Sequence, residues 1–183
     1  MLDSTSPAPV HKIASEFRRL GWASFWFQTV LGVVATGMLL LGAAGLGNTA
    51  GAGGGLLFAV AGLIALGVGS YRAFRNARMG RQLGVADKAV RPSRAETLTL
   101  LRKSIMANMI GLVLIILGAE AFSGALFFKA ASLGFGGLGL LSADPGKLIQ
   151  LVDIFVVLAN THIIAAHFFG LATALWLVNR VAR

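Results

Sequence analysis

The sequence predicts an all-α integral membrane protein, a four-helix bundle with both termini in the cytoplasm. Apolar residues make up 56% of the 183 positions and charged residues only 13%, whereas a soluble domain carries about 25% charged residues. Four apolar runs are each long enough to cross a hydrocarbon core of about 30 Å. The basic residues gather on one side of these runs, and this asymmetry sets the orientation of a protein in the membrane.

Each apolar run has the length of a tilted membrane helix. The four expected spans cover residues 22–46, 55–74, 105–128 and 148–178. Together they form one membrane domain over residues 22–183. Residues 1–21 precede it as a cytoplasmic tail. Two interpretations of His11 to Gly21 stay open: a short helix at the membrane surface, because arginines adjoin apolar residues there, or only a charged flank of the first span.

A basic cytoplasmic loop over residues 75–104 separates the second span from the third. Pro92 interrupts it, and Ser93 followed by Glu96 is a capping-box pattern that predicts the start of a helix. The basic side chains of this loop are candidates for contact with anionic lipid or an acidic partner, although membrane topology alone also accounts for them. They are Arg75, Arg78, Arg81, Lys88, Arg91 and Arg94.

Several classes of function are disfavoured by composition. The chain has no cysteine, which excludes disulfides, thiolate metal sites and cysteine nucleophiles. The net charge of +9 does not indicate nucleic-acid binding, because the basic residues flank the apolar runs. Serine–histidine–acid and metalloprotease spacings are missing from the sequence, so we expect no enzyme.

Ionisable side chains within the apolar runs form the candidate site, because such groups are costly in lipid and are kept where they face a bundle interior, a partner or a wet cavity. Asp153, Asn160 and His167 recur every seven residues, which is nearly two turns, so they form one stripe on the fourth helix. His162 lies on a different face. Glu120 lies inside the third span, and we expect it to line the interior at a depth similar to that of Asp153.

These side chains predict a path for a metal cation. Glu120 and Asp153 would supply oxygen ligands and His162 or His167 a nitrogen ligand, a combination that suits iron, manganese or zinc. The polar residues expected to line the same interior are Gln28, Asn108 and Asn160. Two alternatives stay open: the polar groups fix helix register through inter-helix hydrogen bonds, or a histidine binds haem or a pigment.

Two stretches resemble a known family. The first is Arg19-Leu20-Gly21-Trp22, continuing to Phe25-Trp26 and Gln28, and the second is Ala159-Asn160-Thr161-His162 through His167-Phe168-Phe169. With four spans and a basic central loop, they are similar to a cyanobacterial and plastid membrane family whose plant member is the "permease in chloroplasts" of the inner envelope. That member is assigned both to iron transport and to the protein-import translocon.

The leading functional expectation is therefore a permease for a divalent metal cation, with iron as the substrate that the resemblance implies. Four helices seldom enclose a pathway alone, so a homo-oligomer is expected on this hypothesis. The main alternative is a non-transporting assembly or translocon subunit that binds other membrane proteins, and a third is a pigment or haem carrier. The resemblance implies a cyanobacterial plasma or thylakoid membrane.

Overall fold

The structure is a computed structural model that describes residues 8–45, 52–85, 87, 89, 91–132 and 150–182. These residues form four long helices, α1 (Ala8–Gly45), α2 (Ala52–Leu83), α3 (Arg94–Ala131) and α4 (Leu151–Ala182). All four are long and apolar enough to cross a membrane, and they overlap the four expected spans. The predicted all-α membrane bundle is confirmed, while the side of the membrane on which the termini lie stays a prediction.

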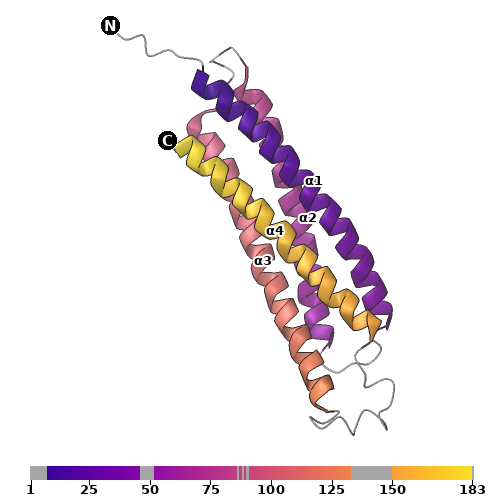
Figure 1. Cartoon of the computed structure of the whole chain (residues 1–183). Coiled ribbons are helices and arrows are strands. Elements are labelled where there is room, and N and C mark those ends of the chain that lie inside the picture. Colours follow the sequence, from indigo (N-terminus) through magenta and orange to yellow (C-terminus); the bar gives the residue numbers. More distant parts are fainter. Residues whose placement is uncertain are drawn as a thin grey trace.

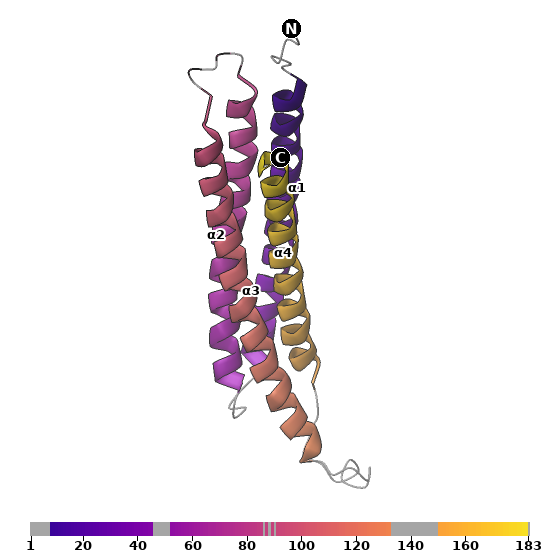
Figure 2. The same cartoon turned by 90° about the vertical axis from the view of Figure 1, so that its left-hand side faces the viewer.

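The four helices run antiparallel to their neighbours in chain order (Figure 1). Each helix packs against the next, α1 also packs against α4, and α2 touches α4 across the bundle. The start of α1, the end of α2, the start of α3 and the end of α4 lie at one end of the molecule (Figure 2). We call this the terminal end.

The start of α3 shows the predicted capping box. The backbone N–H of Glu96 donates to Ser93 Oγ at 3.2 Å, and the backbone N–H of Ser93 donates to Glu96 Oε2 at 2.8 Å. These two bonds satisfy donors that the first turn of a helix leaves free. The helix therefore begins at Arg94, well before the expected span at residue 105.

The short interfacial helix expected over residues 11–21 is not separate, and that prediction was wrong. These residues are the first turns of α1, which continues to Gly45. Ala14 and Phe17 are 4% and 0% exposed and pack inside the bundle. The other three helices also extend to the terminal end. Their apolar side chains bury those of the first turns of α1, which a lone amphipathic segment would bury in lipid.

The interior is divided into two apolar cores with a polar layer between them. The terminal core comprises Ala14, Phe17, Leu83, Leu101 and Leu177. The membrane core comprises Ala35, Leu39, Ala59, Leu66, Ile115, Phe122, Val156, Ala159, Ile163 and Ala166. On all four helices the polar layer falls between them, and its buried side chains include Ser24, Gln28, Asn76, Ser104, Asn108 and His167.

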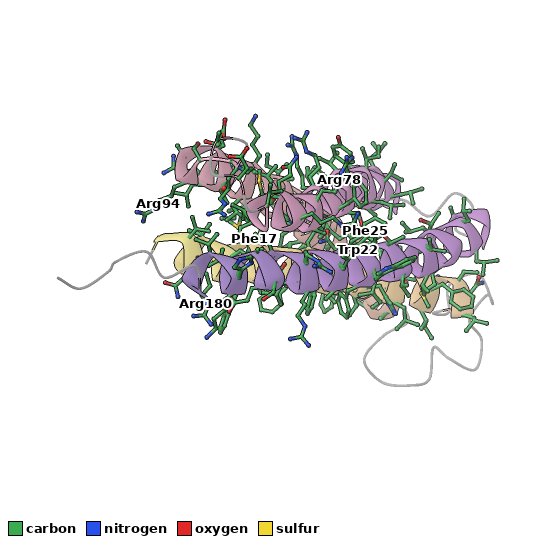
Figure 3. The ribbon with its side chains drawn as sticks, turned by 90° about the horizontal axis from the view of Figure 1, so that it is seen from above. Phe17, Trp22, Phe25, Arg78, Arg94 and Arg180 are labelled. Carbon is green, nitrogen blue, oxygen red and sulfur yellow. The ribbon has the colours of Figure 1, made fainter. Side chains whose placement is uncertain are left out.

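Polar contacts join the helices at the terminal end. The Nε of Arg180 lies 3.0 Å from Glu16 Oε2, which ties α4 to α1. Arg94 of α3 donates to the backbone carbonyl of Ala182 at the end of α4. Figure 3 shows Arg94 and Arg180 near this end, with Phe17 farther along α1. These contacts therefore hold the helices together at the terminal end, where they extend farthest beyond their apolar spans.

Phe17→Ala tests whether the terminal core stabilises the fold. The ring is fully buried, so its loss is expected to cost about 3–5 kcal/mol. Phe127→Ala is the matched control, because Phe127 is 61% exposed and the same truncation there leaves no cavity. Thermal unfolding in detergent, followed by circular dichroism, should show a large fall in Tm for Phe17→Ala alone. Equal changes in both variants would contradict the packing.

Candidate functional site

The imidazole of His167 is the centre of the polar layer. Its side chain is fully buried, with Nδ1 3.2 Å from Asn108 Oδ1 and Nε2 3.1 Å from the carbonyl oxygen of Gly62. A neutral ring carries one N–H and can donate to only one of these oxygens. The ring therefore connects α4 to both α3 and α2, and its orientation is fixed from two sides.

The ring fits because α3 carries a glycine opposite it. A Cβ added at Gly111 would lie 2.1 Å from Cε1 and 2.3 Å from Nε2 of His167. No side-chain carbon tolerates such a distance, so the imidazole occupies the space that any other residue at position 111 would fill. The α3 backbone and the ring are in direct contact.

A second set of polar contacts joins α1 to α4. Gln28 Nε2 donates to Ser24 Oγ at 2.8 Å, and Thr173 Oγ1 lies 3.2 Å from the same hydroxyl. A Cβ added at Gly170 would lie 2.6 Å from both Gln28 Nε2 and Asn108 Oδ1. The two amides and the imidazole therefore pack side by side. The Oε1 of Gln28 has no hydrogen-bond partner within the described ranges.

A third contact joins α2 to α3. Asn76 Nδ2 donates to Ser104 Oγ at 3.2 Å, and Asn108 Nδ2 donates to the Ser104 backbone carbonyl at 2.9 Å. Ser24, Asn76 and Ser104 were not among the residues predicted to line the interior. Asn76 fell beyond the expected end of the second span, inside the basic loop. The spacing could have identified Asn76, because it lies seven residues after Gly69, a buried glycine of α2 that faces Gln28 and Asn108, and therefore on the same helix face.

Asp153 is held by the chain itself. It is 2% exposed, and its Oδ2 lies 2.8 Å from Lys129 Nζ and accepts the backbone N–H of Gln150 at 2.8 Å. The carboxylate caps the start of α4 and joins it to the end of α3. Lys129 was also missed, although the expected spans placed both residues at the same membrane surface.

Glu120 is exposed on the outside of α3, and the prediction that it lines the interior beside Asp153 was wrong. The buried face of α3 runs through Ile115, Gly118 and Phe122. Glu120 follows Gly118 by two positions, or about 200° around the helix. The side chain therefore points away from the bundle.

The remaining stripe residues of α4 differ in their surroundings. Asn160 is buried at 3% exposure, and its Oδ1 has no hydrogen-bond partner within the part of the chain described. His162 is half-buried, and its Nδ1 donates to the carbonyl of Leu158 one turn earlier at 2.7 Å. Asp153, Asn160 and His167 all lie on the buried face, with His162 apart from them.

These positions do not converge on one metal ion. Asp153 and His167 are about 21 Å apart along α4 at about 1.5 Å per residue, and Glu120 faces outward. Within the described ranges, three or more His, Cys, Asp or Glu side chains nowhere come together as a metal-binding group. A metal path through Glu120, Asp153, His162 and His167 stays a prediction.

The basic residues of the predicted loop lie at the terminal end. Arg75, Arg78, Arg81 and Arg94 are exposed, and Lys88 lies outside the described residues. The Nη2 of Arg91 donates to the carbonyl of Val85 at 2.7 Å. This bond joins a residue just before α3 to a residue just after α2. The Arg78 guanidinium lies over the ring of Phe74, 5.9 Å from its centroid; Figure 3 labels Arg78 together with Trp22 and Phe25 of α1.

Comparison with known proteins gives a family and one curated relative. The model of a family described as "Protein of unknown function (DUF3611)" matches residues 7–182. The Arabidopsis thaliana protein named "Protein TIC 21, chloroplastic" is 29% identical over 175 residues, which cover 94% of this chain and 58% of the relative. The chain thus spans little more than half of that relative. No solved structure matches. The predicted resemblance to a plastid membrane family is confirmed, and the chain is a multi-pass membrane protein.

Gly111→Ala tests the contact between α3 and the His167 ring. The added methyl group has no space, and overpacking of this kind costs about 1–3 kcal/mol. Gly37→Ala is the control, because a Cβ at this helical glycine meets nothing within 4 Å. We expect a lower Tm in detergent for Gly111→Ala and an unchanged or higher Tm for Gly37→Ala. An unchanged Tm in both variants would place the ring elsewhere.

A double-mutant cycle tests the ion pair between α3 and α4. Lys129→Met leaves the buried Asp153 carboxylate alone, which costs up to about 3–5 kcal/mol, and Asp153→Asn leaves the partly buried Lys129 ammonium alone at a smaller cost. The double variant removes both charges, so its loss of stability should be much smaller than the sum of the single losses. Unfolding free energies measured in one detergent give the coupling. Strict additivity would show that the two side chains do not interact.

Proposed function

The chain belongs to the DUF3611 family, and we propose that it is a non-transporting subunit of a membrane-protein assembly, binding other membrane proteins within the bilayer. The observation that carries this proposal is the outward position of Glu120 on α3. The interior of the bundle is occupied by its own packing. The Glu120 carboxyl group is instead on the outside, where a partner can reach it.

The close packing of the interior supports a structural role. A Cβ added at Gly42 would lie 2.5 Å from Val156, and one added at Gly118 would lie 3.0 Å from the backbone nitrogen of Ala59. Together with the His167 contact, the helices touch at three depths. The ammonium of Lys129 also neutralises Asp153, the carboxylate that a cation entering from that end would meet.

Glu120 supports a partner on the outer face of α3. Its exposed neighbours include Ile116 and Leu117 at 42% and 48% exposure, so the carboxyl group is surrounded by side chains suited to lipid. A lone carboxyl group there is costly unless another group pairs with it. A hydrogen-bond donor or cation from a second membrane protein would remove that cost.

A groove between α1 and α2 offers a second surface. It has a volume of about 250 Å³, and its lining includes Thr29, Gly67 and Ser70. The hydroxyl oxygens of Thr29 and Ser70 are 3.0 Å apart, and a Cβ at Gly67 meets nothing within 4 Å. Small and hydroxyl-bearing residues are typical of contacts between membrane helices. A partner helix with a small-residue face would fit here.

The family resemblance supports the same role, because it implies a translocon subunit as well as an iron permease. The excess of basic residues at the terminal end favours a cytoplasmic location for that end. A cyanobacterial plasma or thylakoid membrane follows from the resemblance. Permeation of a divalent metal, with iron as substrate, is the rival hypothesis, and a separate experiment tests it.

Site-specific photo-crosslinking tests the proposed surfaces. A photoreactive amino acid at position 120 or 67 should give a discrete adduct with another membrane protein in the native membrane, and one at Val33, an exposed position on α1, is the comparison. Glu120→Gln should reduce the adduct formed from position 117, and Gly67→Leu should reduce co-purification. Adducts only at twice the mass of the chain would show a homo-oligomer and contradict the proposal.

Metal uptake into proteoliposomes tests the rival. We expect iron(II) uptake equal to that of protein-free vesicles, both for the unaltered chain and for Asp153→Asn. Uptake above this background that Asp153→Asn or Glu120→Gln abolishes would overturn the non-transporting role. Binding of a divalent metal without uptake would agree with a non-transporting role, and the crosslinking result would then show whether a membrane-protein partner is present.

A further inference from the structure

A basic groove lies between α2 and α3 near the terminal end, on the outside of the helix pair that Asn76 and Ser104 join. It has a volume of about 510 Å³. A neighbouring pocket of about 250 Å³ shares Arg75, Met79, Gln82 and Leu100 with it, so the two are continuous along α2. The groove opens on the side of the bundle, where a lipid headgroup can reach it.

Three cations line the groove without a carboxylate partner. Arg72, Arg75 and Lys103 all line it, and none of them forms an ion pair with a residue that the structure describes. The Nε of Arg72 is buried and has no hydrogen-bond partner within the same residues. A buried guanidinium N–H without an acceptor is costly, and an anion in the groove would supply the acceptor.

The acidic side chain in the lining does not fill this role. Glu96 lines the groove, but its Oε2 accepts the backbone N–H of Ser93 in the capping box. It lies beyond ion-pair distance of Arg72, Arg75 and Lys103. The groove therefore keeps an excess of positive charge.

The rest of the lining suits a ligand that is also apolar. Met79, Pro92 and Leu100 form part of the walls. Tyr71, which precedes the first of these cations and lines the adjoining pocket, is 55% exposed, and tyrosine is enriched at the level of lipid headgroups. Lys103 lies two residues before the expected third span. The expected spans therefore predict that the groove lies at the level of the phosphate groups in the nearer leaflet.

We propose that this groove binds the phosphate of an anionic phospholipid from the leaflet at the terminal end. The Arg72 and Arg75 guanidiniums and the Lys103 ammonium contact the phosphate oxygens, and the glycerol and upper acyl carbons lie against Met79 and Leu100. Arginine presents paired N–H donors that match phosphate oxygens. Basic pockets between membrane helices bind such headgroups. This site is separate from the partner surfaces at Glu120 and the α1–α2 groove.

Native mass spectrometry of the full chain, released from a neutral detergent, tests the site. Phosphatidylglycerol should bind at one equivalent and phosphatidylcholine should not. Arg75→Gln/Lys103→Gln removes two exposed cations and should weaken phosphatidylglycerol binding about 25-fold, at about fivefold per basic residue. Arg18→Gln/Arg19→Gln removes the same charge from exposed positions on α1 and should change it less than about twofold. Equal weakening in both pairs would overturn the proposal.

Two further measurements separate the lipid from other outcomes. Arg72→Gln alone should also weaken phosphatidylglycerol binding. If this substitution lowers the Tm of the chain, added phosphatidylglycerol should not raise the Tm of the variant. Inorganic phosphate and glycerol 3-phosphate are added as competitors at millimolar concentration. Failure to displace the lipid supports a phospholipid site, because the apolar walls hold only the lipid. Displacement at concentrations comparable to the lipid would overturn the lipid assignment in favour of a soluble phosphate ligand.

Discussion

The contact between the His167 ring and the α3 backbone is the constraint on which the bundle depends. An imidazole within the membrane needs hydrogen bonds, and it finds them at Asn108 and at the carbonyl of Gly62. Both bonds require α2, α3 and α4 to approach closely, which glycine at position 111 permits. The polar layer therefore fixes helix register, and the apolar cores on either side of it align accordingly.

This use of the interior has a consequence for function. Asn108 lies beside Gln28 and is hydrogen-bonded to His167, and Asp153 is bound to Lys129. The charged groups that lack an ion-pair partner among the described residues include Glu120 on the outside of α3 and the cations between α2 and α3. The proposed partner and lipid sites both lie on these outer surfaces. An intramembrane polar residue indicates function only when its partners within the fold are known.

Asp153 and Glu120 show what helical periodicity in a sequence can predict about a buried carboxylate. Periodicity alone placed Asp153 in one stripe with Asn160 and His167, and all three are buried. The same periodicity was available for Glu120, because small and bulky apolar residues recur at positions 111, 115, 118 and 122 of α3 and exclude position 120 from that face. The prediction that Glu120 lines the interior rested instead on its depth along the helix. Depth says how far a residue lies from the membrane surface and nothing about which way it faces.

The sequence by itself determined four spanning helices, the gathering of basic residues at one end and the capping box at Ser93, because these depend on local length, charge and spacing. Only the tertiary structure decided that α1 continues unbroken through residue 21, since Phe17 packs on residues distant in sequence. It likewise decided that Lys129 pairs with Asp153 and that Asn76 bonds to Ser104. Such pairings depend on the relative rotation and height of helices, which close contact at glycines sets and no single segment encodes.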